Sequence, residues 1–204
     1  MAERSNCVTV PLIVGVGGTT SAGSSSEIAL RLSLEAAQGF GFETELLAGA
    51  AIDLPAYDPR RSDAPHGAQR LLDALRRADG LIISTPSYHG GSSGLIKNAL
   101  DYAEELRCDA RPYLDGRAVG LIVTAHGAQG LGTALTAMRS VVHALRGWPT
   151  PYAACLNAAQ EPFAQGRPAR TDVTDQLALV ARQVAEFARM RRALAAQDAV
   201  APAG

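Results

Sequence analysis

The sequence predicts a doubly wound α/β domain, in which helices cover both faces of a five-stranded parallel sheet. Segments with the composition of strands alternate five times with segments of helical periodicity, and short connections join them. Several strand segments are continuous apolar runs, which is typical of strands buried on both faces. With 204 residues, 47% of them hydrophobic, the chain is long enough for one well-buried domain.

The expected strands differ in how far each should be buried. The first, third and fourth are apolar runs and should lie inside the sheet. The second alternates Glu43 and Glu45 with less polar side chains, so one of its faces should meet solvent. In chain order the strands are Val10–Val16, Phe42–Leu47, Leu81–Ser84, Ala118–Thr124 and Pro151–Leu156. We expect them in the spatial order 2-1-3-4-5.

Five further segments show the apolar spacing of helices. The first contains Ile28, Leu32 and Ala36 at intervals of four residues, and the others are His66–Ala78, Gly94–Leu106, Thr133–Leu145 and Val173–Leu194. Three prolines between Leu54 and Pro65 predict a surface loop. We therefore expect a single domain over residues 1–204, with residues 1–7 and 196–204 as loose tails.

Charge and cysteine content exclude several classes of protein. The 19 basic and 20 acidic residues leave a net charge of −1, which argues against a nucleic-acid-binding surface and a strongly acidic electron carrier. Cys7, Cys108 and Cys155 are far apart and form no CxxC pair, so neither a disulfide framework nor a thiolate zinc site is expected. The apolar stretch Val8–Val16 contains Pro11 and runs into glycines, which favours a strand over a signal peptide. No run approaches the roughly 18 apolar residues of a membrane span, and we expect a soluble cytoplasmic protein.

A loop rich in glycine and hydroxyl groups follows the first strand, from Gly17 to Ser26. Amides at the start of a helix, surrounded by hydroxyls, can hold a phosphate without a formal positive charge. The alternative is an ordinary turn with a serine cap, but three serines and two threonines exceed what capping needs. The loop matches neither the GK[ST] ending of a Walker loop nor GxGxxG, and it lacks the GxSxG elbow of a serine hydrolase.

The segment after the third strand contains the most specific motif, from Thr85-Pro86-Ser87-Tyr88 through Gly94 to Lys97-Asn98 and Asp101. It resembles the TPxYxxxxxGxxKNxxD signature of the NAD(P)H-dependent FMN reductases, a flavodoxin-like family. The serine loop, Leu54–Pro59 and Thr124–Gly130 with Gly132 agree with it in order and spacing. The similarity covers about residues 10–160. It is nearest to the branch of reductases that serve two-component monooxygenases.

This resemblance implies an enzyme that uses NADPH or NADH to reduce FMN, with no catalytic side chain in the hydride step. Ser24, Ser26 and neighbouring amides would hold the FMN phosphate in a loop that also offers Gly18, Thr19, Thr20, Ser21 and Ser25. The flavin ring would meet Pro86, Ser87, Tyr88, His89 and Gly90, and its pyrimidine side Thr124, His126, Gly127 and Gly130. Many relatives have an arginine in the first loop, whereas this chain has threonine and serine there. Phosphate affinity would then rest on amides and hydroxyls.

Other polar residues have simpler interpretations. His66 and His143 should be surface residues on helices, while His89 and His126 could hydrogen-bond to flavin but lack the spacing of metal ligands, so no metal is expected. Lys97 and Asp101, four residues apart, should form a structural pair.

Three functions remain open from the sequence. FMN could be a loosely held substrate whose reduced form supplies a monooxygenase, or a prosthetic group of a quinone or azo reductase. A flavodoxin-like electron carrier is the third. Relatives complete the flavin site with a neighbouring subunit, which implies a homodimer or homotetramer.

Overall fold

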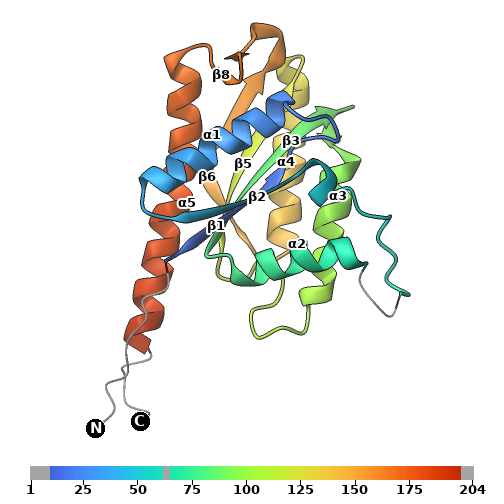
Figure 1. The fold of residues 1–204 in the computed structure, drawn as a ribbon, viewed down its shortest axis with the longest axis vertical. Helices are drawn as coiled ribbons and strands as arrows, with labels where there is room; N and C mark the ends of the chain where they lie inside the picture. The colour runs from blue at the N-terminus through green and yellow to red at the C-terminus, as the bar shows by residue number, and fades with distance from the viewer. Residues whose placement is uncertain (1–9, 62–64, 199–204) are drawn as a thin grey trace.

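The computed structural model describes residues 10–61 and 65–198. Five parallel strands form the sheet in the order β2-β1-β3-β5-β6, which confirms the predicted order 2-1-3-4-5 (Figure 1). Their bounds are Leu12–Gly17 for β1, Glu43–Ala48 for β2, Gly80–Tyr88 for β3, Ala118–Ala125 for β5 and Trp148–Asn157 for β6. A short strand, β4 (Gly91–Ser92), pairs antiparallel with the end of β3.

Helices cover both faces of the sheet, as predicted (Figure 1). Their bounds are Ser25–Gly39 for α1, His66–Arg77 for α2, Gly94–Asp101 for α3, Ala128–Ala144 for α4 and Thr171–Asp198 for α5. Apolar side chains of α2, α3 and α4 pack in one core, and those of α1 and α5 pack in the other. On the α5 side the strands carry glycines, because a Cβ at Gly80 would lie 2.5 Å from Val184 Cγ1 and one at Gly120 would lie 2.6 Å from Val180 Cγ1.

Several boundaries differ from the prediction. Helix α4 begins at Ala128 rather than Thr133, and β3 continues four residues past Ser84 to Tyr88. The third helix ends at Asp101 and continues as a 3-10 turn, Tyr102–Leu106. Helix α5 runs to Asp198, so residues 196–198 are helical and not part of a loose tail. The expected tail over residues 1–7 lies outside the described residues.

A short hairpin between β6 and α5 was not predicted. It consists of β7 (Phe163–Ala164) and β8 (Arg167–Pro168), and it follows a 3-10 turn over Ala158–Gln160. Two-residue strands leave no periodic pattern in a sequence, so only the surrounding glycine and proline could have indicated a turn here.

The side chain of a fully buried arginine, Arg117, donates hydrogen bonds to carbonyls at the C-terminal end of α2. Arg117 is 1% exposed, and all of its recorded acceptors are backbone carbonyls: Ala78 (3.0 Å), Arg76 (3.1 Å), Tyr113 (3.1 Å) and Asp115 (3.4 Å). The carbonyls of Arg76 and Ala78 are among those that a helix C-terminus leaves without partners. Burial lowers the pKa of Arg117 to about 10.

The two ends of the described chain meet at the amino-terminal edge of the sheet (Figure 1). Asp79, just before β3, accepts a bond from the amide of Leu12 at 2.8 Å and pairs with Arg192 near the end of α5 at 3.1 Å. None of the helices among the described residues is long and apolar enough to cross a membrane.

Candidate functional site

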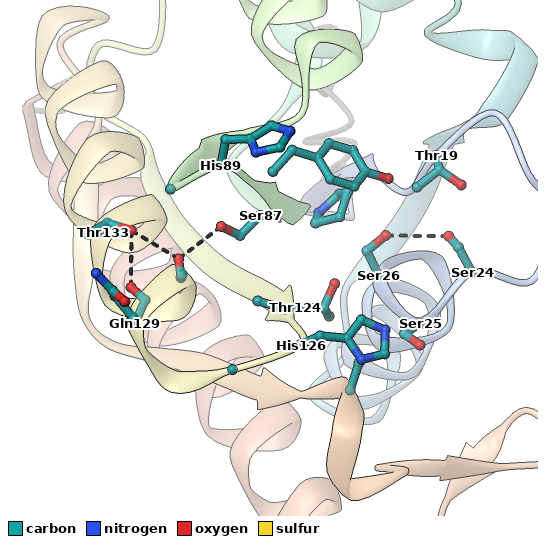
Figure 2. Close-up of a pocket in the computed structure, with 17 residues that line it drawn as sticks. Thr19, Ser24, Ser25, Ser26, Ser87, His89, Thr124, His126, Gln129 and Thr133 are labelled. Atoms are coloured by element: carbon teal, nitrogen blue, oxygen red, sulfur yellow. Dashed lines mark hydrogen bonds between the residues drawn. The ribbon is translucent and has the colours of Figure 1, made fainter.

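A cavity of about 940 Å³ opens at the carboxyl edge of the sheet (Figure 2). Four segments line it: the first loop with the start of α1, the end of β3 with the turn to β4, the end of β5 with the first turns of α4, and the 3-10 turn after β6. Ligands of doubly wound sheets bind at this edge, beyond the carboxyl ends of the strands and where the strand order reverses. The strand order reverses between β1 and β3, and the first two of these segments lie at the carboxyl ends of those two strands.

Most residues predicted for the site line this cavity. From the first loop they are Thr19, Ser24, Ser25 and Ser26; from β3 and its turn, Pro86, Ser87, Tyr88, His89 and Gly90; from β5 and α4, Thr124, His126, Gly127 and Gly130. Gly18, Thr20 and Ser21 do not line it.

Four residues of the cavity were missed: Ala125, Gln129, Thr133 and Ala158. Gln129 and Thr133 are four residues apart on α4, so a correct start for this helix would have indicated them together. Nothing in the sequence marks Ala158.

The serine loop ends in a capped helix. Ser24 is the N-cap of α1: its Oγ accepts a bond from the amide of Glu27 at 3.3 Å and lies 3.3 Å from Ser26 Oγ. The Ser84 hydroxyl donates to the carbonyl of Ser26 at 2.8 Å and so fixes the first turn against β3. Within the described part of the chain, no protein acceptor is recorded for the amides of Ser25 and Ser26. This end of the cavity therefore offers helix N-terminal amides and hydroxyls to an anion.

A tight hairpin forms the second wall. His89 (φ 52°) and Gly90 (φ 85°) both have positive φ, and Tyr88 pairs with Gly91 across them. Two central residues of this kind correspond to a type I′ turn, whose twist matches that of antiparallel strands. Histidine is among the few side chains that tolerate this conformation. The turn leaves the Tyr88 side chain 55% exposed beside the cavity.

A hydrogen bond joins the third wall of the cavity to the second. Ser87 Oγ donates to the carbonyl of Gly130 at 2.9 Å, and Thr133 Oγ1 donates to the carbonyls of Gln129 and Gly130 (Figure 2). Gly127 precedes α4 with φ 137°, a conformation that L side chains rarely adopt. At Gly127 and Gly130 the backbone of this wall therefore faces the cavity with no side chain of its own, whereas Thr124, His126 and Gln129 contribute side chains.

Most of the side chains that line the cavity are uncharged. Among the residues that line it in the described chain, none is Lys, Arg, Asp or Glu, and two are histidines, His89 and His126. No group of three or more His, Cys, Asp or Glu in the described residues is arranged to hold a metal ion. The site can therefore bind a polar ring and a phosphate by hydrogen bonds, with no cationic side chain in contact.

The rest of the signature motif lies on α3, outside the cavity. Asn98 Oδ1 accepts from the amide of Tyr57 at 2.8 Å, and its Nδ2 donates to the carbonyls of Leu54 and Pro55 at 3.0 Å each. Lys97 and Asp101 form the expected pair on α3. Asn98 thus holds the loop after β2 against α3, and none of these three residues lines the cavity.

The fold and the position of the cavity define a flavodoxin-like α/β protein. Residues 11–161 match the NADPH-dependent FMN reductase family, and the chain belongs to this family. The family includes FMN, azo and quinone reductases that use nicotinamide nucleotides.

Individual relatives are similar over parts of the chain. An FMN reductase (NADPH) from Pseudomonas putida is 38% identical over 96 residues, which are 46% of this chain and 47% of that protein. An NADPH azoreductase from a Bacillus species is 35% identical over 100 residues, 48% and 53% of the two chains. The chain thus matches about half the length of these two proteins. A 2-hydroxy-1,4-benzoquinone reductase from a Burkholderia species is 31% identical over 130 residues, 64% and 68% of the two chains.

Solved structures share the fold. A flavoenzyme NAD(P)H:(acceptor) oxidoreductase from Paracoccus denitrificans superposes with a TM-score of 0.74 at 22% identity, covering 89% of this chain and 99% of that one. The apo form of an NADH:FMN oxidoreductase superposes with a TM-score of 0.66 at 20% identity, covering 89% and 90%.

Proposed function

We propose that this protein binds FMN in the cavity and reduces it with NADPH or NADH. One observation supports this most directly: the cavity combines hydroxyls and helix amides at one end with glycine backbone at the other, and no Lys, Arg, Asp or Glu of the described residues lines it. An anionic phosphate suits the first end, and a flat polar ring suits the second. When bound, FMN supplies the atom that accepts a hydride from the nicotinamide.

The first loop would hold the phosphate. Ser24, Ser25 and Ser26 present hydroxyls, and the amides of Ser25 and Ser26 point out of the first turn of α1. Each hydrogen bond to a charged oxygen contributes roughly 1.5–3 kcal/mol. Several such bonds together can supply the phosphate affinity that an arginine of the first loop would supply in many relatives.

The two glycine-containing walls would hold the flavin ring. Backbone amides around Gly127 and Gly130 can donate to the pyrimidine oxygens, where negative charge grows as the ring is reduced. His126 can donate to the same edge. The Tyr88 hairpin would cover one end of the ring and leave a face open to the nicotinamide, so that both rings stack at contact distance.

Reduced FMN would then leave and supply a monooxygenase. The alternative is a reductase that retains FMN and passes electrons to quinones or azo compounds, as the names of the Burkholderia and Bacillus relatives suggest for those proteins. NAD(P)H oxidation that rises with added FMN and saturates supports the first function. A purified protein that keeps FMN through gel filtration and reduces a quinone without added flavin supports the second. Failure to oxidise NADPH or NADH with either acceptor would contradict both.

We also propose a homodimer or homotetramer. The cavity is open and Tyr88 is exposed beside it, so a neighbouring subunit can complete its wall. Sedimentation at micromolar concentration tests this, and a single species at the monomer mass of 21.2 kDa would contradict it.

A further inference from the structure

Glu27 follows the serines at the proposed phosphate end of the cavity but does not itself line the cavity. It occupies the first turn of α1, directly after the three serines that line the cavity, and its side chain is 11% exposed. Its Oε2 accepts a bond from the amide of Gly23 at 3.0 Å. Its Oε1 pairs with Arg31 one helical turn later.

The serine loop folds around this carboxylate. A Cβ at Gly18 would lie 3.2 Å from Glu27 Cβ and 3.6 Å from Cγ, so the loop backbone packs directly on the glutamate stem. The amide of Glu27 is bonded to Ser24 Oγ, and its carboxylate is bonded to the amide of Gly23. Glu27 thus fixes the two loop residues that immediately precede α1.

The pair also sets the charge next to the phosphate. An anion at a helix N-terminus interacts favourably with the helix dipole, and Glu27 already occupies that position on α1. A carboxylate without a partner here would repel a phosphate held by the same turn. Arg31 cancels this charge from outside the cavity, since Arg31 does not line it.

We propose that Glu27 is the positioning residue of the phosphate loop and that Arg31, by neutralising it, determines the preference of the site for FMN over riboflavin. This rests on the proposed function, because it takes the flavin phosphate as the ligand of the loop. Glu27 contributes the hydrogen bond that shapes the loop, and the pair with Arg31 contributes no net charge.

A double-mutant cycle of Glu27 and Arg31 tests the proposal. Dissociation constants for FMN and riboflavin are measured by fluorescence titration at low ionic strength. Arg31→Gln leaves the carboxylate unbalanced and should weaken FMN about threefold to tenfold while riboflavin changes less than about twofold. Glu27→Gln keeps an acceptor for Gly23 and leaves Arg31 unpaired, so FMN should bind about threefold more tightly. The double variant should return near the parent value.

Further variants separate shape from charge. Glu27→Ala leaves Arg31 unpaired as Glu27→Gln does but also removes the acceptor for Gly23, so it should bind FMN about tenfold more weakly than Glu27→Gln. Lys97→Gln is the matched control, because it breaks a helical i, i+4 pair on α3 away from the cavity and should alter neither flavin. High salt should reduce the effect of Arg31→Gln and leave the difference between Glu27→Ala and Glu27→Gln unchanged.

The outcomes are distinguishable. If the parent binds neither flavin, the proposed function fails and this inference fails with it. If the parent prefers FMN but the FMN-to-riboflavin ratio of Arg31→Gln equals that of the parent, only the inference is overturned. Parallel loss of both flavins in the Arg31 and Glu27 variants, with lowered melting temperatures, would show a structural role and overturn it as well.

Discussion

The hydroxyl of Ser87 donates a 2.9 Å hydrogen bond to the carbonyl of Gly130, which joins the end of β3 to the first turn of α4. Both residues line the cavity, so this bond sets the separation of two of its walls. A Cβ at Gly130 would lie 3.2 Å from Ser87 Oγ, which shows how closely the two segments approach.

Ser87→Ala should therefore impair binding more than folding. Loss of one such bond costs about 0.5–1.5 kcal/mol of stability, and the two walls can then separate. We expect flavin affinity to fall about threefold to tenfold. Thr136→Ala is the control, since Thr136 Oγ1 donates to the carbonyl of Gly132 at 3.0 Å on the same helix but does not line the cavity. Equal flavin affinity in Ser87→Ala and the parent would contradict the role of this bond.

Gly127→Val should retain the fold and lose flavin binding by about tenfold or more. No protein atom lies within 4 Å of a Cβ placed there, so crowding is not the cause. The cause is φ 137°, which a β-branched residue would force to change, moving the backbone that faces the ring. Gly132→Ala, on α4 with equally open space, should bind flavin like the parent. Fluorescence titration of both variants decides the question.

Ser26→Ala should separate the two flavins. Removal of its hydroxyl should weaken FMN by about tenfold and leave riboflavin nearly unchanged, because riboflavin has no phosphate. Ser24→Ala should in addition lower the free energy of unfolding by about 1 kcal/mol, since Ser24 caps α1. Parallel weakening of both flavins in Ser26→Ala would mean that the serines only shape the helix start.

Arg117→Met should lower the free energy of unfolding by about 2–4 kcal/mol, because the carbonyls of Arg76 and Tyr113 would lose a buried donor. Methionine fills much of the volume of the arginine side chain, so the loss of stability comes from the missing hydrogen bonds and not from a cavity. Arg182→Met, at an exposed position of α5, should change the same quantity by less than about 0.5 kcal/mol. Denaturant unfolding at pH 7 compares the two variants.

Stability should fall at alkaline pH through Tyr57. Burial, and then the bond to Glu105 and the charge of that residue, raise the pKa of Tyr57 above its usual 10.0. The unfolded chain ionises first as the pH rises through 10.0, so the folded state holds more protons and the free energy of unfolding decreases. Tyr57→Phe should flatten this decrease, and Glu105→Gln should flatten it in part. An unchanged slope in Tyr57→Phe would contradict the assignment.

The sheet order and most of the cavity could be predicted from the sequence, because apolar runs and glycine-rich segments leave strong local patterns. The extension of β3 beyond Ser84 could not be predicted in this way. A proline normally ends a strand, but β1 stops opposite Ser84, so Pro86 has a strand neighbour only on the β5 side, where it pairs with Thr124. The start of α4 was missed because Gly130 and Gly132 weaken helical periodicity, and packing against the sheet outweighs that cost.

Glu27 was missed for a different reason. Ser24 and Glu27 have the spacing of a capping box, a signal available in the sequence. In the structure the carboxylate reaches Gly23 rather than the amide of the cap residue itself, so even that signal would not have indicated its contact with the loop.

The meeting of Leu12, Asp79 and Arg192 at the amino-terminal edge has a practical consequence for handling the protein. The described chain begins and ends on the side of the sheet opposite the carboxyl ends of the strands, where the cavity lies (Figure 1). A fusion partner or a surface anchor joined directly at residue 10 or residue 198 would therefore be attached on the side opposite the cavity. The described part of the chain is in this way suited to tethering, for instance on an electrode or beside a second enzyme in a single polypeptide.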